Sequence, residues 1–96
     1  MKFLVNEKVR SEKFYSVGYC TVLDKYILVC VVTWIAWYNR YYEITKEEYE
    51  LFGLEELDNL AENLYKQGIS SERFLFSDKK EENDKEQLTL RDFVWL

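Results

Sequence analysis

The sequence contains no histidine, which removes the most common catalytic and metal-binding side chain. Ser-His-Asp and Cys-His catalysis are therefore excluded, and so are the common zinc sites that use histidine. Its two cysteines, Cys20 and Cys30, cannot form a four-thiolate zinc site and are too few for a disulfide scaffold. We predict that the protein holds no metal and no cofactor.

Proline is also absent and glycine occurs only three times, and neither common glycine-rich phosphate-binding motif is present. Residues 78–86 carry many carboxylates but lack the glycine and the ligand spacing of a calcium-binding loop. The longest apolar run, residues 26–38, is interrupted by Thr33 and is shorter than the roughly 20 residues of a membrane-spanning helix. The first residues are too poor in charge and apolar side chains for a secretory signal. We expect a cytoplasmic protein without a membrane partner.

What the chain does have is an uneven charge. Residues 1–42 carry six basic and three acidic side chains, a net charge of +3, whereas residues 43–96 carry seven basic and fifteen acidic ones, a net charge of −8. The acidic half would repel a phosphate backbone, so direct binding to nucleic acid is disfavoured. It would attract a basic protein, and proteins that bind nucleic acid are commonly basic.

The hydrophobic pattern predicts a single α+β domain over residues 1–96. Residues 14–23 alternate as in a strand with one heavier face, and residues 26–38 are apolar on both sides, which is typical of a central strand. Further strands are predicted at about residues 40–45, 73–77 and 87–96. Together they predict an antiparallel sheet of about five strands with one helical layer.

That helical layer is predicted at about residues 46–67. Thr45 and Glu48 match the capping box T-x-x-E at its start, and Gly68 is a natural stop at its end. One layer covers only one face of the central strand. The other apolar face needs the N-terminal segment with a strongly curled sheet, or another chain, and we favour the first because domains usually close their own core.

The relative positions of the two cysteines depend on the turn between the first two predicted strands. A two-residue turn at Asp24 and Lys25 makes Cys20 face Val29 and points Cys30 to the other side of the sheet. A three-residue turn would instead place the two cysteines opposite each other. We expect two buried free thiols rather than a disulfide.

Carboxylates are the remaining candidates for catalysis, because paired Asp or Glu residues can hydrolyse glycosidic bonds. The carboxylates on the predicted helix are expected to be solvated, with no reason for a raised pKa, and a chain this small has little room for a substrate cleft. We therefore predict that the protein is not an enzyme.

Tyrosines cluster where the predicted third strand meets the helix. Protein interfaces favour Tyr, Trp and Arg in their centres. Tyr42 and Tyr49 fit the core by periodicity. For Tyr38 and Tyr41, a place in the core and a place in a partner interface are equally good interpretations.

The run WYNRYYEITKEEYELF, followed about twenty residues later by SSERFLFSDKKEEN, resembles the small immunity proteins of bacterial toxin systems. It is most similar to those paired with contact-dependent growth inhibition or other polymorphic toxins, and the resemblance covers about residues 34–83. The resemblance implies a cytoplasmic, non-enzymatic protein that binds one cognate toxin domain, often a nuclease. Such proteins cover the active site of the toxin or block its access to substrate. The family supplies no fixed binding residues.

The candidate binding residues therefore come from charge and aromatic character alone. We predict that a basic toxin domain packs on Tyr38 and Tyr41 and pairs with acids of the helix and of the loop that follows the 73–77 strand. The predicted acids are Glu55, Asp58, Glu62, Asp78, Glu81, Glu82 and Asp84. For each acid, a solvated charge without a partner is at least as good an interpretation. We expect the unbound protein to be a monomer or a weak homodimer.

Three other functions stay open at this point. A phage or plasmid inhibitor that mimics nucleic acid would carry an extended acidic stripe at about phosphate spacing. A small enzyme would have a concave pocket with an Asp or Glu of perturbed pKa. A housekeeping oligomer would bury its doubly apolar central strand against a second copy.

Overall fold

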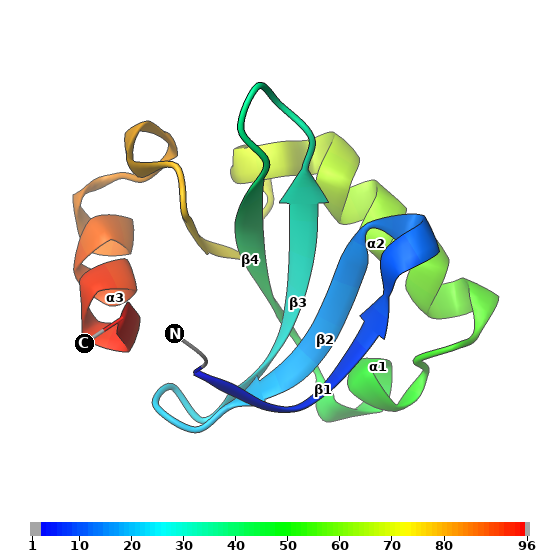
Figure 1. Cartoon of the computed structure of the whole chain (residues 1–96). Helices are drawn as coiled ribbons and strands as arrows, with labels where there is room; N and C mark the ends of the chain where they lie inside the picture. Colours follow the sequence, from blue (N-terminus) through cyan, green and yellow to red (C-terminus); the bar gives the residue numbers. More distant parts are fainter. Residues whose placement is uncertain (1–2, 96) are drawn as a thin grey trace.

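The computed structural model describes residues 3–95. Within them, five antiparallel strands lie side by side in the order of the chain, so that each strand pairs with the next (Figure 1). Their bounds are Leu4–Arg10 (β1), Tyr15–Cys20 (β2), Lys25–Val32 (β3), Tyr38–Ile44 (β4) and Phe74–Ser77 (β5). This sheet and its helices confirm the predicted α+β class and the five-stranded antiparallel sheet.

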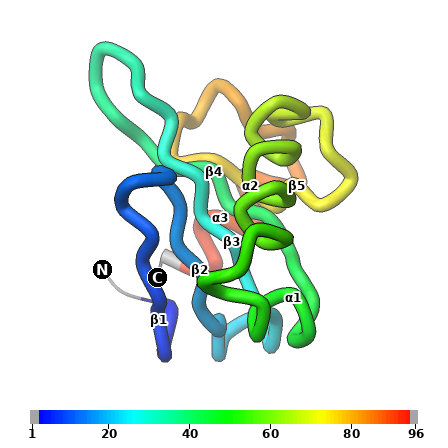
Figure 2. The backbone as a smooth tube through the Cα atoms, turned by 90° about the vertical axis from the view of Figure 1, so that its right-hand side faces the viewer, coloured from blue at the N-terminus to red at the C-terminus, as the bar shows by residue number. Residues whose placement is uncertain are grey.

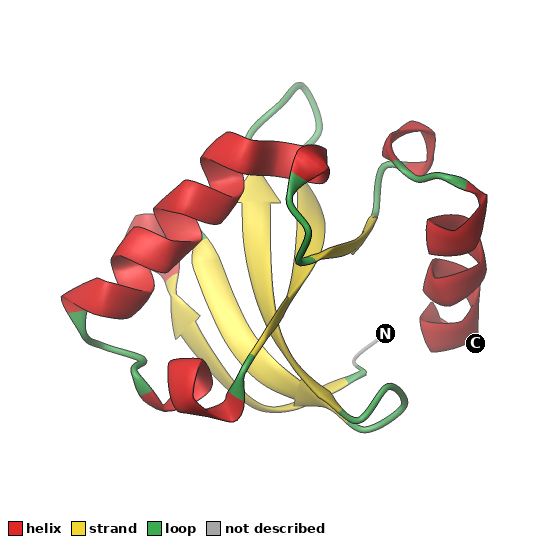
Figure 3. Cartoon of the chain, turned by 180° about the vertical axis from the view of Figure 1, so that it is seen from behind, coloured by secondary structure: helices red, strands yellow, loops and turns green. Residues whose placement is uncertain are grey.

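Helices lie on both faces of the sheet. The α-helices are α1 (Lys46–Glu50), α2 (Glu55–Gln67) and α3 (Lys85–Trp95), and the short 3-10 helices are η1 (Ser11–Lys13), η2 (Gly68–Ser70) and η3 (Lys80–Glu82). Seen from behind, α1 and α2 cross in front of the strands (Figure 3). The sheet separates them from α3 (Figure 2).

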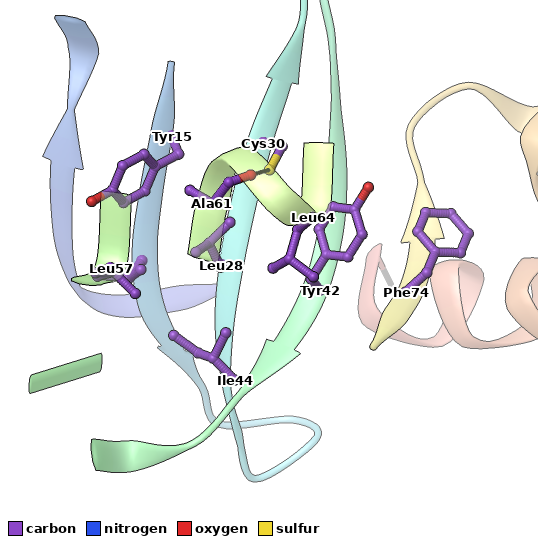
Figure 4. Packing of buried hydrophobic residues seen from close by; sticks show 10 residues of the cluster. Tyr15, Leu28, Cys30, Tyr42, Ile44, Leu57, Ala61, Leu64 and Phe74 are labelled. Atoms are coloured by element: carbon purple, nitrogen blue, oxygen red, sulfur yellow. Dashed lines mark hydrogen bonds between the residues drawn. The ribbon is translucent and has the colours of Figure 1, made fainter. Parts of the chain in front are cut away.

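The layer formed by α1 and α2 follows the predicted signals. Thr45 Oγ1 accepts a 3.1 Å hydrogen bond from the Glu48 amide, and the Thr45 amide donates a 2.8 Å bond to Glu48 Oε1, which completes the capping box. Gly68 ends α2 with a φ of 62°, a conformation that glycine adopts without strain. α2 packs its buried side chains on one sheet face, and the residues that meet there include Leu57, Ala61, Leu64, Leu28, Cys30 and Tyr42 (Figure 4).

The prediction of a strand over residues 87–96 is wrong, because residues 85–95 form α3, and residue 96 lies outside the described residues. Asp84 and Gln87 exchange two 2.8 Å hydrogen bonds between side chain and backbone, which is a capping box of the same kind as the one at Thr45. Leu90 and Val94 lie one turn apart and pack together on the sheet. The helix therefore satisfies both its own backbone and its apolar residues.

α3 also explains how the second face of the sheet is covered. Val94 packs against a buried cluster whose sheet residues are Leu4, Cys20, Ile27, Val29, Tyr41 and Phe76. Of the two covers that we considered, the N-terminal segment contributes, since Leu4 belongs to edge strand β1. The contribution of α3 was not predicted. No second chain is needed to bury these residues.

β3 is buried on both faces, as predicted, but it is shorter than predicted. Ile27 and Val29 face the α3 side, whereas Leu28 and Cys30 face α2. The strand ends at Val32, which pairs with Tyr38 of β4. Residues 33–37, predicted as part of the strand, form the loop of the β3–β4 hairpin instead.

The two cysteines point to opposite faces of the sheet, as the two-residue turn predicts, but neither of the two predicted turns is present. Cys20 pairs with Lys25, so the turn of this hairpin spans residues 21–24. Cys20 and Cys30 lie in clusters on opposite faces of the sheet, and both are buried free thiols. Burial raises the pKa of the Cys30 thiol to about 12, so this thiol stays protonated and unreactive at neutral pH.

Candidate functional site

The β3–β4 loop carries Ile35, the most exposed large apolar side chain of the described residues, together with two exposed tryptophans. Trp34 is 63% exposed, Ile35 94% and Trp37 64%. The exposed ring of Phe14, which follows η1, meets the Trp37 ring edge-on at 5.8 Å between centroids. The loop projects beyond the ends of its strands (Figure 1). We call Phe14, Trp34, Ile35 and Trp37 the aromatic tip.

A cleft of about 690 Å³ lies beside the aromatic tip, between α2 and the ends of β1, β2 and β3. Phe14 belongs to both features, and Thr33 of the loop lines the cleft as well. The side of the cleft formed by α2 presents Glu55, Asp58, Glu62 and the ring of Tyr65. The structure therefore brings all three acids predicted on the helix to one hollow.

Asp58, in the middle of this face of α2, already accepts hydrogen bonds from other side chains of this protein. Arg10 donates two 3.1 Å hydrogen bonds, from Nε and Nη2, to the two carboxylate oxygens of Asp58. The Tyr15 hydroxyl donates a third bond of 2.6 Å. These bonds, that of Tyr15 first, hold the pKa of Asp58 below its usual range. We therefore withdraw Asp58 from the predicted partner-binding acids, because its acceptor sites join α2 to β1 and β2.

Glu55 and Glu62 lie on the rim of the cleft and are exposed. Glu62 forms a 3.1 Å ion pair with Lys66, in which both side chains are more than 60% exposed, so the pair is weak. Among the described residues no salt bridge involves Glu55. The charged residues lining the cleft are the acids Glu12, Glu55, Asp58 and Glu62 and the bases Arg10 and Lys13. The cleft thus has a net charge of −2.

Tyr38 and Glu82 are joined to each other rather than exposed together as a binding surface. The Tyr38 hydroxyl donates a 2.7 Å hydrogen bond to Glu82, and Arg40 donates two more, of 2.9 and 2.6 Å, to the two Glu82 oxygens. Arg40 is the main reason that the pKa of Glu82 falls to about 2. With Arg40 and Glu82 side chains 17% and 13% exposed, this pair fastens η3 to β4, and we withdraw Glu82 from the site.

Tyr41 and Asp78 form a second fastening on the α3 side. Tyr41 is buried, stacks on Phe76 with ring centroids 4.5 Å apart, and contacts both oxygens of Asp78 through its hydroxyl at 3.0 and 3.2 Å. Burial raises the pKa of Asp78. Tyr41 is a core residue and Asp78 is its partner, so neither is part of an accessible binding surface.

The remaining predicted acids, Glu81 and Asp84, are exposed. Asp84 caps α3 through its bond with Gln87, and Glu81 lies in η3. The segment between β5 and α3 is not the unanchored loop that its charges suggest. Asn83 holds it through bonds to the backbone of Ser77, accepting 2.7 Å from the amide and donating 2.9 Å to the carbonyl.

The aromatic tip is not among the predicted binding residues. Its signal was present in the sequence as TWIAW, residues 33–37, but tryptophan and isoleucine are also strand formers, and the run was assigned to the central strand. Large aromatic side chains without a cover indicate an interaction surface. Both side chains are uncovered in the structure.

No group of three or more Cys, Asp or Glu side chains among residues 3–95 has a geometry that could hold a metal ion. Within that same part of the chain, no helix combines the length and the apolar character needed to cross a membrane.

Comparison with protein-family models, with curated proteins and with solved structures finds no match to this chain.

Proposed function

We propose that this protein is an immunity protein that binds a cognate bacterial toxin domain one-to-one and thereby neutralises it. The toxin domain is proposed to be a basic nuclease domain, and the complex forms in the cytoplasm. The protein carries out no bond-making or bond-breaking step. It inhibits by occupying a surface of the toxin, either over the active site or across the path of the substrate.

The observation that carries this proposal is the aromatic tip, which gathers two tryptophans and an isoleucine on one solvent-exposed loop. Trp34, Ile35 and Trp37 have most of their side-chain surface in water, and none of the three belongs to either core cluster. Large apolar side chains exposed together on one loop are typical of a protein-binding surface. Tryptophan is also among the residues that contribute most binding energy at interfaces.

Charge supplies the second part of the mechanism. The chain has a net charge of −5, and exposed acids lie beside the tip at the rim of the cleft. An acidic surface accelerates the approach of a basic partner, while buried apolar contacts slow its release. Fast capture and slow release are both needed when the unbound partner is lethal.

The nucleic-acid-mimic alternative is less well supported by the arrangement of the acids. A mimic needs a continuous row of charges at about phosphate spacing that is available to the host enzyme. Asp58, Asp78 and Glu82 instead accept hydrogen bonds from side chains of this chain. These three carboxylates hold elements of the fold together, so they are not available to a host enzyme and any such row is interrupted.

The proposal is tested by pairing this chain with a toxin domain encoded directly upstream of its gene. Co-expression should restore the growth of bacteria that produce the toxin domain, and the two purified proteins should elute as a one-to-one complex. Failure both to restore growth and to form a complex contradicts the proposal, as does turnover of a substrate by the purified protein.

A pair of matched variants shows whether the tip is responsible. Trp37→Ala should weaken the complex about ten- to thirtyfold, the loss expected for an aromatic residue at the centre of an interface. Phe93→Ala removes a similarly exposed ring from α3, on the other side of the sheet, and should leave the affinity unchanged.

A further inference from the structure

We infer that the cleft beside the aromatic tip receives an arginine side chain of the partner protein, while apolar residues of the same partner cover the tip. This inference rests on the proposed function for the existence of a protein partner. It adds the chemistry by which that partner is recognised, and it names the α2 carboxylates that make the contact.

Three acids are spaced along α2 so that they face the same way. Glu55 lies three residues before Asp58 and Glu62 lies four residues after it, so all three carboxylates share one face of the helix. All three line the cleft. The middle carboxylate already holds the guanidinium of Arg10, and the two outer carboxylates lie on either side of it at the rim.

The cleft keeps a negative charge when the pair of Arg10 and Asp58 is set aside. Arg10 and Asp58 neutralise each other through their two hydrogen bonds. Glu12, Glu55 and Glu62 are then opposed by Lys13 in the cleft and by Lys66, which pairs with Glu62 from outside it, so an excess of one negative charge remains. A cation is the complementary occupant.

The lining of the cleft suits a guanidinium better than an ammonium group. The cleft is lined by the rings of Phe14 and Tyr65 as well as by carboxylates. A guanidinium is planar, stacks on aromatic faces and binds carboxylates through two parallel hydrogen bonds, whereas an ammonium is compact and more strongly hydrated. The pairing of Arg10 with Asp58 shows that this wall accommodates the two-bond geometry.

The cleft is continuous with the aromatic tip, which favours a protein over a free amino acid or another small cation. Phe14 belongs to the cleft and to the aromatic tip, and Thr33 leads from the cleft into the loop that carries Trp34. An isolated arginine would fill the cleft and leave the tip in water. A basic protein segment with neighbouring apolar residues would cover both at once.

The test uses the purified chain and a blocked peptide, acetyl-Gly-Ser-Arg-Gly-Ser-Gly-amide, with matched peptides that carry lysine or uncharged citrulline in place of arginine. Peptide binding is followed by NMR at low salt from the backbone amides and the tryptophan indoles. The arginine peptide should shift signals of residues 10–15 and 55–65 and of the Trp37 indole. The lysine peptide should bind more weakly, and the citrulline peptide should cause no such shifts.

Two double variants with the same loss of charge identify the carboxylates. Glu55→Gln with Glu62→Gln should weaken arginine-peptide binding roughly two- to tenfold, as expected for two partly solvated ion pairs. Glu72→Gln with Glu86→Gln removes two exposed acids that do not line the cleft and should change the binding less than twofold.

Several outcomes would overturn the inference. Equal weakening by both double variants would show that the peptide responds only to net charge. Equal binding of the citrulline peptide would show that no cation is recognised. Shifts of the same cleft signals with rising protein concentration and no peptide would show that a second copy of the chain occupies the cleft.

The inference and the proposed function can fail separately. If the toxin domain is neutralised but the Glu55→Gln, Glu62→Gln variant binds it with unchanged affinity, the function stands and the arginine site is wrong. If the arginine peptide binds at the cleft but the toxin domain is neither bound nor neutralised, the site stands and the proposed function is wrong.

Discussion

Two acid-rich segments, residues 55–62 and residues 78–84, carry four acids each and have very different environments. In the second segment, Asp78 and Glu82 accept hydrogen bonds from β4 side chains, and Asp84 caps α3. In the first segment Asp58 is held in the same way, while Glu55 and Glu62 remain at the surface.

This difference shows what decides the role of an acid in this fold. A carboxylate that lies within reach of an arginine or tyrosine on a strand becomes a fastening between elements. A carboxylate on the outer face of a helix, with only solvent or a flexible lysine nearby, remains available to a partner. Composition alone does not distinguish the two.

The largest effect is expected where the second segment is fastened to the sheet. Arg40→Ala leaves Glu82 and the Tyr38 hydroxyl without their cation in a mostly buried position. The free energy of unfolding should fall by about 2–3 kcal/mol, less than for a fully buried pair because both groups keep some contact with water. Urea denaturation monitored by tryptophan fluorescence measures this loss.

Lys66→Ala is the matched control in the first segment. It removes the cation of an ion pair in which both side chains are well exposed, so the free energy of unfolding should change by less than about 0.5 kcal/mol. Equal losses for the two variants would contradict the distinction between fastened and available acids.

The second prediction concerns pH. The pKa of Glu82 is about 2 in the folded protein, against an ordinary value of 4.5, so the folded state holds this proton less tightly than the unfolded state. Glu82 therefore stabilises the fold above about pH 4.5, and this stabilisation is lost as the pH falls towards 2. The difference in unfolding free energy between the native chain and Glu82→Gln should shrink by roughly 1–3 kcal/mol over that range. A difference independent of pH would show that Glu82 does not depend on its charge.

Much of the fold could be predicted because its signals are local. The capping box at Thr45, the stop at Gly68 and the doubly apolar β3 each depend on residues close together in the sequence. The prediction of a strand over residues 87–96 was wrong because Leu88 and Leu90 alternate with polar residues, as in a strand. The capping pair Asp84 and Gln87, three residues apart, was the local signal that would have identified the helix.

The candidate site was harder to predict because its decisive contacts join distant parts of the chain. Arg10 pairs with Asp58 and Arg40 pairs with Glu82, and no local pattern reports either pairing. The length of the β3–β4 hairpin also depends on where the strands stop pairing, at Val32 and Tyr38. Sequence alone therefore indicated acidic and aromatic character but did not show which of these residues are accessible.

The third prediction isolates the helix cap within the second segment. Asp84→Ala removes the side-chain acceptor for the Gln87 amide and should lower the free energy of unfolding by about 1 kcal/mol. Hydrogen exchange of the amides of residues 86–88 should become faster. Asp84→Ser restores an acceptor and should recover most of the loss. An unchanged free energy of unfolding in Asp84→Ala would contradict the capping role of Asp84.

The smallest effect is expected for the exposed acid of the second segment. Glu81→Gln should change the free energy of unfolding by less than about 0.5 kcal/mol, because the side chain lies in solvent. It should also leave the affinity for the toxin domain within twofold. Calorimetric titration measures this affinity, and a large loss would move the binding surface to the 78–84 segment.

The most direct measurement of the whole account is an NMR map of the one-to-one complex with the toxin domain, recorded on the isotope-labelled chain. We expect the largest changes in amide shifts at residues 10–15, 31–37 and 55–65, around the aromatic tip and the cleft. Changes concentrated at residues 78–95, with the tryptophan indoles of the β3–β4 loop unaffected, would contradict it.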